Sequence, residues 1–402
     1  MRRVSGVRAA GADSKRCVIK GAVDTVPFSF ECGTAEGRAK ENTRFRTAEF
    51  ERKNYHKVIS SIETKEGGRS WRKIVASYEK PSLSHSLRQI ANTIIPYFAL
   101  LCVMYLTLDV SYWLTLGLAI PAAGFLVRNF IIFHDCGHGS YFKSKKANRL
   151  LGFFTGLLTF MPSYYWSHEH AMHHATAGDL DRRGNGDIWT LTVQEYLALP
   201  RWRRICYRIY RNPVFLFGVA PLYVFLVHYR YWRPGDKRRA RWSTIRTNLF
   251  LALIVVVASL TIGVKAYVMI QLPIMVIAGA SGVWLFYVQH QFENTYWERH
   301  DEWSYVRHAL EGSSFYKLPR VLQWFSGNIG FHHIHHLSPR IPNYNLQICH
   351  ESDSMFRVVK HLTLWSGLKS LGFRLWDEER KKLVGFGDVR AYNVRQTTLS
   401  RP

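Results

Sequence analysis

The chain has 402 residues, 47% of them hydrophobic and 14% aromatic, and its 54 Lys and Arg against 29 Asp and Glu give a formal net charge of +25. So basic a chain is typical either of a nucleic-acid-binding protein or of a membrane protein with basic cytoplasmic loops. The apolar residues are unevenly distributed, which favours the membrane protein, and the six cysteines form no C-x2-C pair, which argues against a cysteine-based zinc site.

The first 70 residues are polar and basic. Residues 1–80 contain 18 Lys and Arg against 10 Asp and Glu, and no apolar segment of the kind found in secretory signals follows Arg2 and Arg3. We expect a disordered cytoplasmic tail over 1–70, a membrane domain over 71–365 and a second cytoplasmic tail over 366–402.

Two apolar stretches follow the N-terminal tail and are separated by a short connection. Residues 89–108 carry no charge over 20 positions, which is about the length that a helix needs to cross the hydrocarbon core of a bilayer. The second stretch, 110–133, contains one charged residue, Arg128, which can extend its side chain to the nearby interface. Together they predict a transmembrane hairpin whose second helix runs directly into His134.

A second hairpin is predicted further along the chain. Residues 247–264 and 266–289 carry no charge over 18 and 24 positions, and only Lys265 separates them. Two other apolar stretches, 150–166 and 213–227, are shorter, and each contains a proline. Their lengths are typical of interfacial or re-entrant helices.

The distribution of charge predicts the orientation in the membrane. The connection 134–246 contains 18 Lys and Arg against 7 Asp and Glu, whereas the turns of the two hairpins contain only Asp109 and Lys265. By the positive-inside rule, both termini and this connection lie in the cytoplasm. The basic stretches are suited to contact with anionic lipid head groups, although a solvated face would look the same.

Histidines gather in three short windows, 134–138, 168–174 and 332–336. These windows have 17 residues and contain 10 of the 18 histidines, where a uniform distribution would place fewer than one. An expression tag or a metal-scavenging tract would instead form one continuous run. If 150–166 crossed the membrane, the first two windows would face opposite compartments. Because we expect it not to cross, all three windows lie on the cytoplasmic side, and we expect them to form one site.

Within each window the histidines are spaced so that a helix presents them on one face. Residues i, i+3 and i+4 of a helix share a face, and adjacent residues diverge by about 100°. Neighbours that diverge in this way can serve two different metal ions. The eight histidines at these spacings are His134, His138, His170, His173, His174, His332, His335 and His336.

A ninth candidate ligand is His290, at the predicted end of the fourth span, although an interfacial polar residue is an equally good interpretation. His168 and His333 exceed what two ions need, so we expect an outer or structural role for them. The carboxylates that could orient ring nitrogens near the second window are Glu169, Asp179 and Asp181. Ordinary loop or cap positions explain these three carboxylates equally well.

The setting of the histidines favours iron. Imidazole binds zinc, iron, copper and nickel, and structural zinc takes four ligands, so eight histidines exceed what one ion can use. A lipid chain can reach a site at the ends of transmembrane helices. Removal of hydrogen from an unactivated methylene needs a redox-active metal, which zinc is not. We therefore predict a two-metal site of iron that is open to dioxygen.

The three windows resemble the histidine boxes of integral-membrane fatty acid desaturases. They read H-D-C-G-H from His134, H-A-M-H-H from His170 and H-H-I-H-H from His332. The other positions at which the chain is similar to bacterial acyl-lipid desaturases of the delta-12 or delta-5 type are Trp166, 174–181, 286–293, 311–319 and 336–344. Three boxes in this order, with hairpins between them, form a specific signature.

The resemblance implies an all-α integral membrane protein with four transmembrane helices in two hairpins, interfacial helices, and a cytoplasmic helical cap holding a histidine-ligated di-iron site. It implies a desaturase that introduces a cis double bond into an acyl chain of a membrane lipid, using dioxygen and two electrons. The expected location is the bacterial cytoplasmic membrane, and no residue beyond the metal ligands is expected to be catalytic.

The sequence contains neither a haem-binding His-Pro-Gly-Gly segment nor a dinucleotide fingerprint. We therefore expect the electrons to come from a separate ferredoxin-like or cytochrome-type protein, and an acidic carrier would suit the basic loops. The partners are thus a lipid substrate, the membrane and this donor, without nucleic acid.

Two alternatives remain at this point. A di-iron hydroxylase or ketolase acting on a lipid or carotenoid would share the same ligands, and the formation of oxygenated products would distinguish it. A membrane metal transporter would carry ionisable ligands within its spans, whereas here the spans contain almost none. The position of the double bond, the lipid head group and the oligomeric state stay open.

Overall fold

The computed structural model describes residues 71–184, 186–359 and 361–389. The predicted disordered tail over 1–70 lies outside these residues. Within the described part, helices form most of the structure, and the strands are only two or three residues long. The predicted all-α class is therefore confirmed.

Four helices are long and apolar enough to cross a membrane. They are α3 (Leu83–Thr107), α4 (Tyr112–His138), α10 (Arg238–Thr261) and α11 (Val264–His290). All four predicted spans are confirmed. The helices α3 and α10 begin earlier than predicted, because a helix continues through polar interfacial residues beyond the hydrocarbon core that sets the length of the apolar stretch.

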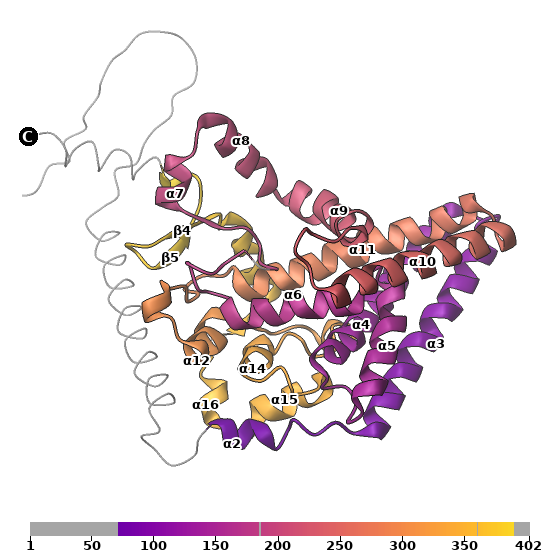
Figure 1. The fold of residues 1–402 in the computed structure, drawn as a ribbon, viewed down its shortest axis with the longest axis horizontal. Helices are drawn as coiled ribbons and strands as arrows, with labels where there is room; N and C mark the ends of the chain where they lie inside the picture. Colours follow the sequence, from indigo (N-terminus) through magenta and orange to yellow (C-terminus); the bar gives the residue numbers. More distant parts are fainter. Residues whose placement is uncertain (1–70, 185, 360, 390–402) are drawn as a thin grey trace, which may run out of the picture. The chain divides into compact units, whose positions relative to one another are not determined.

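The four long helices form two hairpins, α3–α4 and α10–α11, and α4 packs against both α3 and α11 (Figure 1). The buried residues between these helices include Ala119, Ala122 and Ala123 of α4 and Ala278 of α11. Such small residues let helices approach closely within a membrane. Since α4 and α11 are the second helices of their hairpins, they run in the same direction, and their histidine-bearing ends lie at the same level.

The shorter apolar stretches do not form straight spans. Helix α5 (Lys145–Leu158) has 14 residues and is only about 21 Å long, which is too short to cross the bilayer. A turn at Phe160, with φ of 60°, leads into α6 (Ser163–Thr176). Helix α8 (Arg201–Tyr210) and the helical run Phe215–Arg230 are bent by 60° relative to each other.

The bent run consists of short helices, and short helices also make up most of the remaining described residues. The run comprises η1 (Phe215–Val219), α9 (Ala220–Leu226) and η2 (His228–Arg230). The other helices are α2 (Trp71–Ala76), α7 (Val193–Ala198), η3 (His300–Glu302), α12 (Tyr305–Arg307), η4 (His308–Gly312), α13 (Arg320–Phe325), α14 (His332–Leu337), α15 (Asn343–Ser352), α16 (Ser354–Arg357), α17 (Leu364–Lys369) and η5 (Ser370–Gly372). Figure 1 shows α12, α14, α15 and α16 grouped beyond the ends of α4 and α11. We call this group the helical cap.

The helical cap packs around an apolar core that also includes Ile131 of α4. Its buried residues include Leu310 of η4, Ile334 of α14, Leu346 of α15 and Phe356 of α16. Val75 of α2 packs into the same core, so the first described helix belongs to the cap. This core supports α14, which carries the third histidine box.

Two small sheets tie distant segments together. The strand β1 (Leu191–Thr192) pairs in parallel with β4 (Leu375–Asp377), and β4 pairs antiparallel with β5 (Lys382–Val384). The strand β2 (Phe315–Tyr316) pairs in parallel with β3 (His361–Leu362). The strands β4 and β5 lie within the segment from 366 onward that was expected to be a tail, and they were not predicted, because two or three residues carry no periodic pattern.

Candidate metal centre

Four helix ends bring the nine predicted ligands together. The last turn of α4 carries His134 and His138, and Gly139 ends this helix in the left-handed conformation, with φ of 72°. Helix α6 carries the second box, α14 carries the third, and α11 ends at His290. All three boxes thus lie on one side of the spans, as the predicted interfacial position of 150–166 requires.

The first cluster contains five histidines whose ligand nitrogens all lie within 4.8 Å of one another: His134, His138, His170, His174 and His335. The Nε2 atom of His335 lies 3.1 Å from Nε2 of His134 and 2.9 Å from Nε2 of His174. The Nε2 atoms of His174 and His170 are 3.2 Å apart. All three boxes contribute to this cluster.

The second cluster contains His173, His290 and His336, again with ligand nitrogens within 4.8 Å of one another. The Nε2 atom of His290 lies 3.2 Å from Nε2 of His173 and 3.0 Å from Nε2 of His332. The adjacent His173 and His174 thus serve different clusters, as their divergence on a helix predicts. His290 is 6% exposed, and its ring lies among the other histidines of this cluster.

One aspartate orients a histidine in each cluster. The carboxylate of Asp135 accepts a hydrogen bond of 3.0 Å from Nδ1 of His134, and that of Asp187 accepts one of 2.5 Å from Nδ1 of His173. Because the proton is then on Nδ1, each Nε2 presents its lone pair to the centre of its cluster.

This arrangement fits bound cations. Lone pairs of facing imidazoles repel one another at about 3 Å unless a positive charge lies between them. Nε2 of His138 and both ring nitrogens of His336 have no hydrogen-bond partner among the described residues, although these nitrogen atoms are buried. A nitrogen-rich pair of clusters of this kind suits a borderline divalent metal such as Fe(II).

Asp135 is itself held in place by residues from two other elements. Its second oxygen accepts hydrogen bonds from the backbone N–H of Asn343, at 2.7 Å, and from the side-chain amide of Asn343, at 2.9 Å. That amide also bonds to Gln89 of α3, at 3.1 Å. The first box is therefore fixed to α3 and to the start of α15.

The three carboxylates considered from the sequence have other partners. Glu169 pairs with Arg233 at 3.2 Å, Asp179 accepts from Nδ1 of His300 at 2.7 Å, and Asp181 pairs with Arg299 at 2.5 Å. Asp179 and Asp181 lie in the loop after α6, as the alternative interpretation expects, whereas Glu169 lies within α6. Asp187 was missed, because a position 14 residues after His173 carries no local signal.

His168 and His333 point away from both clusters. His168 is exposed on the outer face of α6, where its ring lies 6.5 Å from that of Tyr164. His333 is buried behind the third box, and its Nε2 lies 3.0 Å from Nδ1 of His350. The expected outer or structural role agrees with both positions.

A tenth histidine, His308 of η4, reaches the second cluster and was not predicted. Its ring centre lies 5.4 Å from that of His336 and 5.9 Å from that of His290. Gly178 and Gly312 make room for it, since a Cβ atom at either position would come within 2.3 Å of its Nδ1. A lone histidine without a spacing partner carries no signal in the sequence.

Burial keeps several histidines of the site neutral. Desolvation, followed by the neighbouring imidazoles, lowers the pKa values of His170, His174, His332, His335 and His336 well below the usual range. Burial also lowers the pKa of His308 to about 3. Neutral imidazole is the form that binds a metal, so the site is prepared for one at neutral pH.

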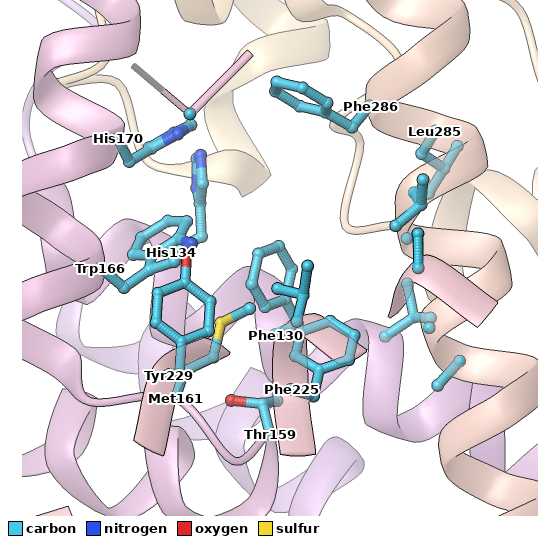
Figure 2. A pocket seen from close by; sticks show the side chains of 18 of the residues that line it. Phe130, His134, Thr159, Met161, Trp166, His170, Phe225, Tyr229, Leu285 and Phe286 are labelled. Atoms are coloured by element: carbon cyan, nitrogen blue, oxygen red, sulfur yellow. The ribbon is translucent and has the colours of Figure 1, made fainter. Parts of the chain in front are cut away.

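A cavity of about 530 Å³ begins at this site and extends between α4, α6, α9 and α11. His134, His170 and His332 line one end, and Figure 2 shows Phe286 across from His134 and His170. The side chains toward the other end include Thr159, Met161 and Phe225. Most of the lining is aliphatic or aromatic, so the cavity suits a hydrocarbon chain.

Comparisons with known proteins agree with this geometry. Residues 111–360 match the fatty acid desaturase family. The chain is 51% identical to a fatty acid desaturase of Bacillus subtilis over 79% of this chain and 90% of the relative. It is also similar to two Synechocystis proteins, each 27% identical. The sn-1 oleoyl-lipid 12-desaturase is matched over 60% of this chain and 66% of the relative, and the sn-1 acyl-lipid omega-3 desaturase (ferredoxin) over 54% and 61%.

Proposed function

The chain belongs to the fatty acid desaturase family, and from this premise we propose that its nine clustered histidines hold two iron ions that act on an acyl chain of a membrane lipid. The protein is an integral-membrane fatty acid desaturase. The observation that carries the more specific proposal is the pair of histidine clusters, each with an aspartate-oriented ring, at one end of an apolar cavity.

We assign the ligands by cluster. The first ion would bind His134, His138, His170, His174 and His335, and the second would bind His173, His290, His332 and His336. Such a centre would supply the chemistry that removes one hydrogen from each of two adjacent methylenes. The reaction consumes dioxygen, two electrons and two protons, and two waters form. Its ligand set resembles that expected for iron and exceeds that of structural zinc.

The residues around the clusters position the lipid chain. The ring of Phe130 lies 6.4 Å from that of His134, and the ring of Phe286 lies 5.0 Å from that of His173. Both phenylalanines line the cavity, so they would hold a methylene beside both clusters and keep water away.

We further propose that the clusters face the cytoplasm and that a ferredoxin-like or cytochrome-type protein delivers the electrons. The excess of basic residues in 134–246 supports this orientation, and a net charge of +25 would attract an acidic carrier. One Synechocystis relative is named as a ferredoxin-type desaturase. Supplying the purified protein with each reduced carrier in turn distinguishes the two donors.

Expression in a bacterial host without polyunsaturated lipids tests the function. We expect new double bonds, located by mass spectrometry of the host lipids, and about two irons per chain in protein purified without chelators. Oxygenated lipids without new double bonds would contradict the desaturase. Stoichiometric zinc in an active preparation would contradict the di-iron centre.

A further inference from the structure

We propose that Gly282 is a specificity-determining residue. The acyl chain would pass beside it on the way to the deep end of the cavity, and its lack of a side chain would leave room for the longest chains. This inference rests on the proposed function and extends it to the length of the substrate. Three observations carry it: the depth of Gly282 in the cavity, the empty space at its Cβ position, and the distribution of polar groups in the lining.

The parallel course of α4 and α11 gives the depth of each position in the cavity. His134 and His290 mark the metal end of the two helices. Phe130 and Phe286 lie one turn below them, and Gly282 lies two turns below His290, or about 12 Å. The cavity therefore passes between two phenylalanines near the clusters, runs past Gly282 and continues to Met275.

The surroundings of Gly282 differ from those of its neighbour Gly279. A Cβ atom at position 279 would lie 2.9 Å from Cβ of Pro221, so close helix packing explains that glycine. A Cβ atom at 282 would meet nothing within 4 Å, although the residue is only partly exposed and lines the cavity. Glycine in a helix interior is less favourable than alanine. Close packing does not explain the glycine at position 282, which borders the cavity and has open space at its Cβ position.

The lining shows which end of a lipid enters the deep part. Glu169 and Gln289 adjoin ligand residues in the sequence, and Asp187 bonds to His173, so these polar groups lie at the metal end. Leu126 and Met275 line the deeper part. A charged or ester head group would lose its hydration among such apolar side chains. The hydrocarbon end therefore occupies the deep part, and the head group stays outside it.

The test is a series of increasing side-chain size at one position: Gly282→Ala, Gly282→Val and Gly282→Leu. Each purified, iron-loaded protein receives reduced donor and vesicles of phospholipids whose acyl chains increase in two-carbon steps. We expect the conversion of the longest accepted chain relative to the shortest to fall with side-chain size, by at least about tenfold for leucine. Alanine and leucine raise helix propensity, so a weaker helix would not explain the change.

Gly117→Leu is the matched control. Gly117 also lies within a transmembrane helix, is exposed, and would have nothing within 4 Å of an added Cβ, but it is not among the residues that line the cavity. We expect its chain-length profile to equal that of the unaltered protein.

The outcomes separate this inference from the proposed function. If the unaltered protein converts no lipid, the proposed function fails. If it is active and the Gly282 variants keep its chain-length profile, the inference is overturned. A uniform loss across all lengths at equal iron content would also overturn it, since a purely structural role would act in that way. If the leucine variant does not fold, the alanine variant must still show a smaller shift in the same direction.

Discussion

The hydrogen-bond partners of the ring nitrogens separate the histidines that face the clusters from those that do not. His134 and His173 direct Nε2 to the clusters because aspartates accept from Nδ1, whereas His333 directs its Nε2 to His350. The same residue type, within the same boxes, therefore has two different roles. This distinction leads to two predictions.

The first prediction compares two histidines of α6. His173→Ala removes a nitrogen from the second cluster, and we expect at least about a hundredfold loss of desaturase activity together with a lower iron content per chain. His168→Ala is the control, because His168 lies on the same helix but is exposed and points away. Full activity of the His173 variant would refute the ligand assignment.

The second prediction concerns the orientation of His173. Asp187→Asn keeps the size of the side chain but weakens the hydrogen bond that fixes the Nδ1–H tautomer, so iron should bind about 10- to 100-fold more weakly. Release of iron to a chelator measures this change without relying on turnover. Asp181→Asn, on the same loop and paired with Arg299, should behave like the unaltered protein. Equal iron release from all three proteins would contradict the role of Asp187.

At the scale of elements, one buried arginine joins three segments that are distant in the sequence. Arg211, immediately after α8, is 1% exposed. Its guanidinium donates to the carbonyl oxygen of Trp189 at 3.3 Å, to Oε1 of Gln291 at 3.0 Å and to the carbonyl oxygen of Phe373 at 3.1 Å. It thereby links the loop after α6, the end of α11 and the C-terminal sheet. The C-terminal segment thus forms part of the structure around the metal centre.

We therefore expect Arg211→Met to destabilise the protein. The three acceptors would lose their donor in a buried position, which should lower the free energy of unfolding by about 2–4 kcal/mol. Thermal unfolding in detergent should show a lower midpoint. The control is Arg203→Met, on the exposed face of α8. Equal midpoints for the two variants would show that the C-terminal segment packs independently of Arg211.

At the scale of the whole molecule, the buried histidines make stability depend on pH. Their pKa values are lowered from the ordinary value of 6.5, to about 3 for His308. Below pH 6.5 the unfolded chain therefore binds more protons than the folded protein, so stability is full above this pH and falls below it. Each such histidine contributes about 1.4 kcal/mol per pH unit in this range.

Thermal unfolding of the metal-free protein should accordingly show a midpoint that decreases as the pH falls from 7 toward 5. His308→Phe removes one buried histidine and keeps an aromatic ring in its place, so its midpoint should depend less steeply on pH. A midpoint that stays constant over this range would contradict the burial of neutral histidines.

The sequence by itself was enough for the features that repeat at short range. Long uncharged stretches predicted the four spans, since the thickness of a bilayer sets their length. Spacing of three and four residues selected eight histidines, since one turn of a helix places such residues on one face. The apolar stretch 150–166 is too short to cross the membrane, which predicts that the boxes before and after it lie on the same side. Their convergence in the structure agrees with this prediction.

The tertiary structure alone decided which groups surround these histidines. Asp187, His308 and Arg211 act through partners that lie far away in the chain or follow no helical repeat, so no local pattern could identify them. The cavity has the same origin, because its walls come from many helices and its width at Gly282 depends on how they pack together. A repeat in the sequence predicts which residues share a face of one helix. The space between helices, by contrast, exists only after the helices have packed together.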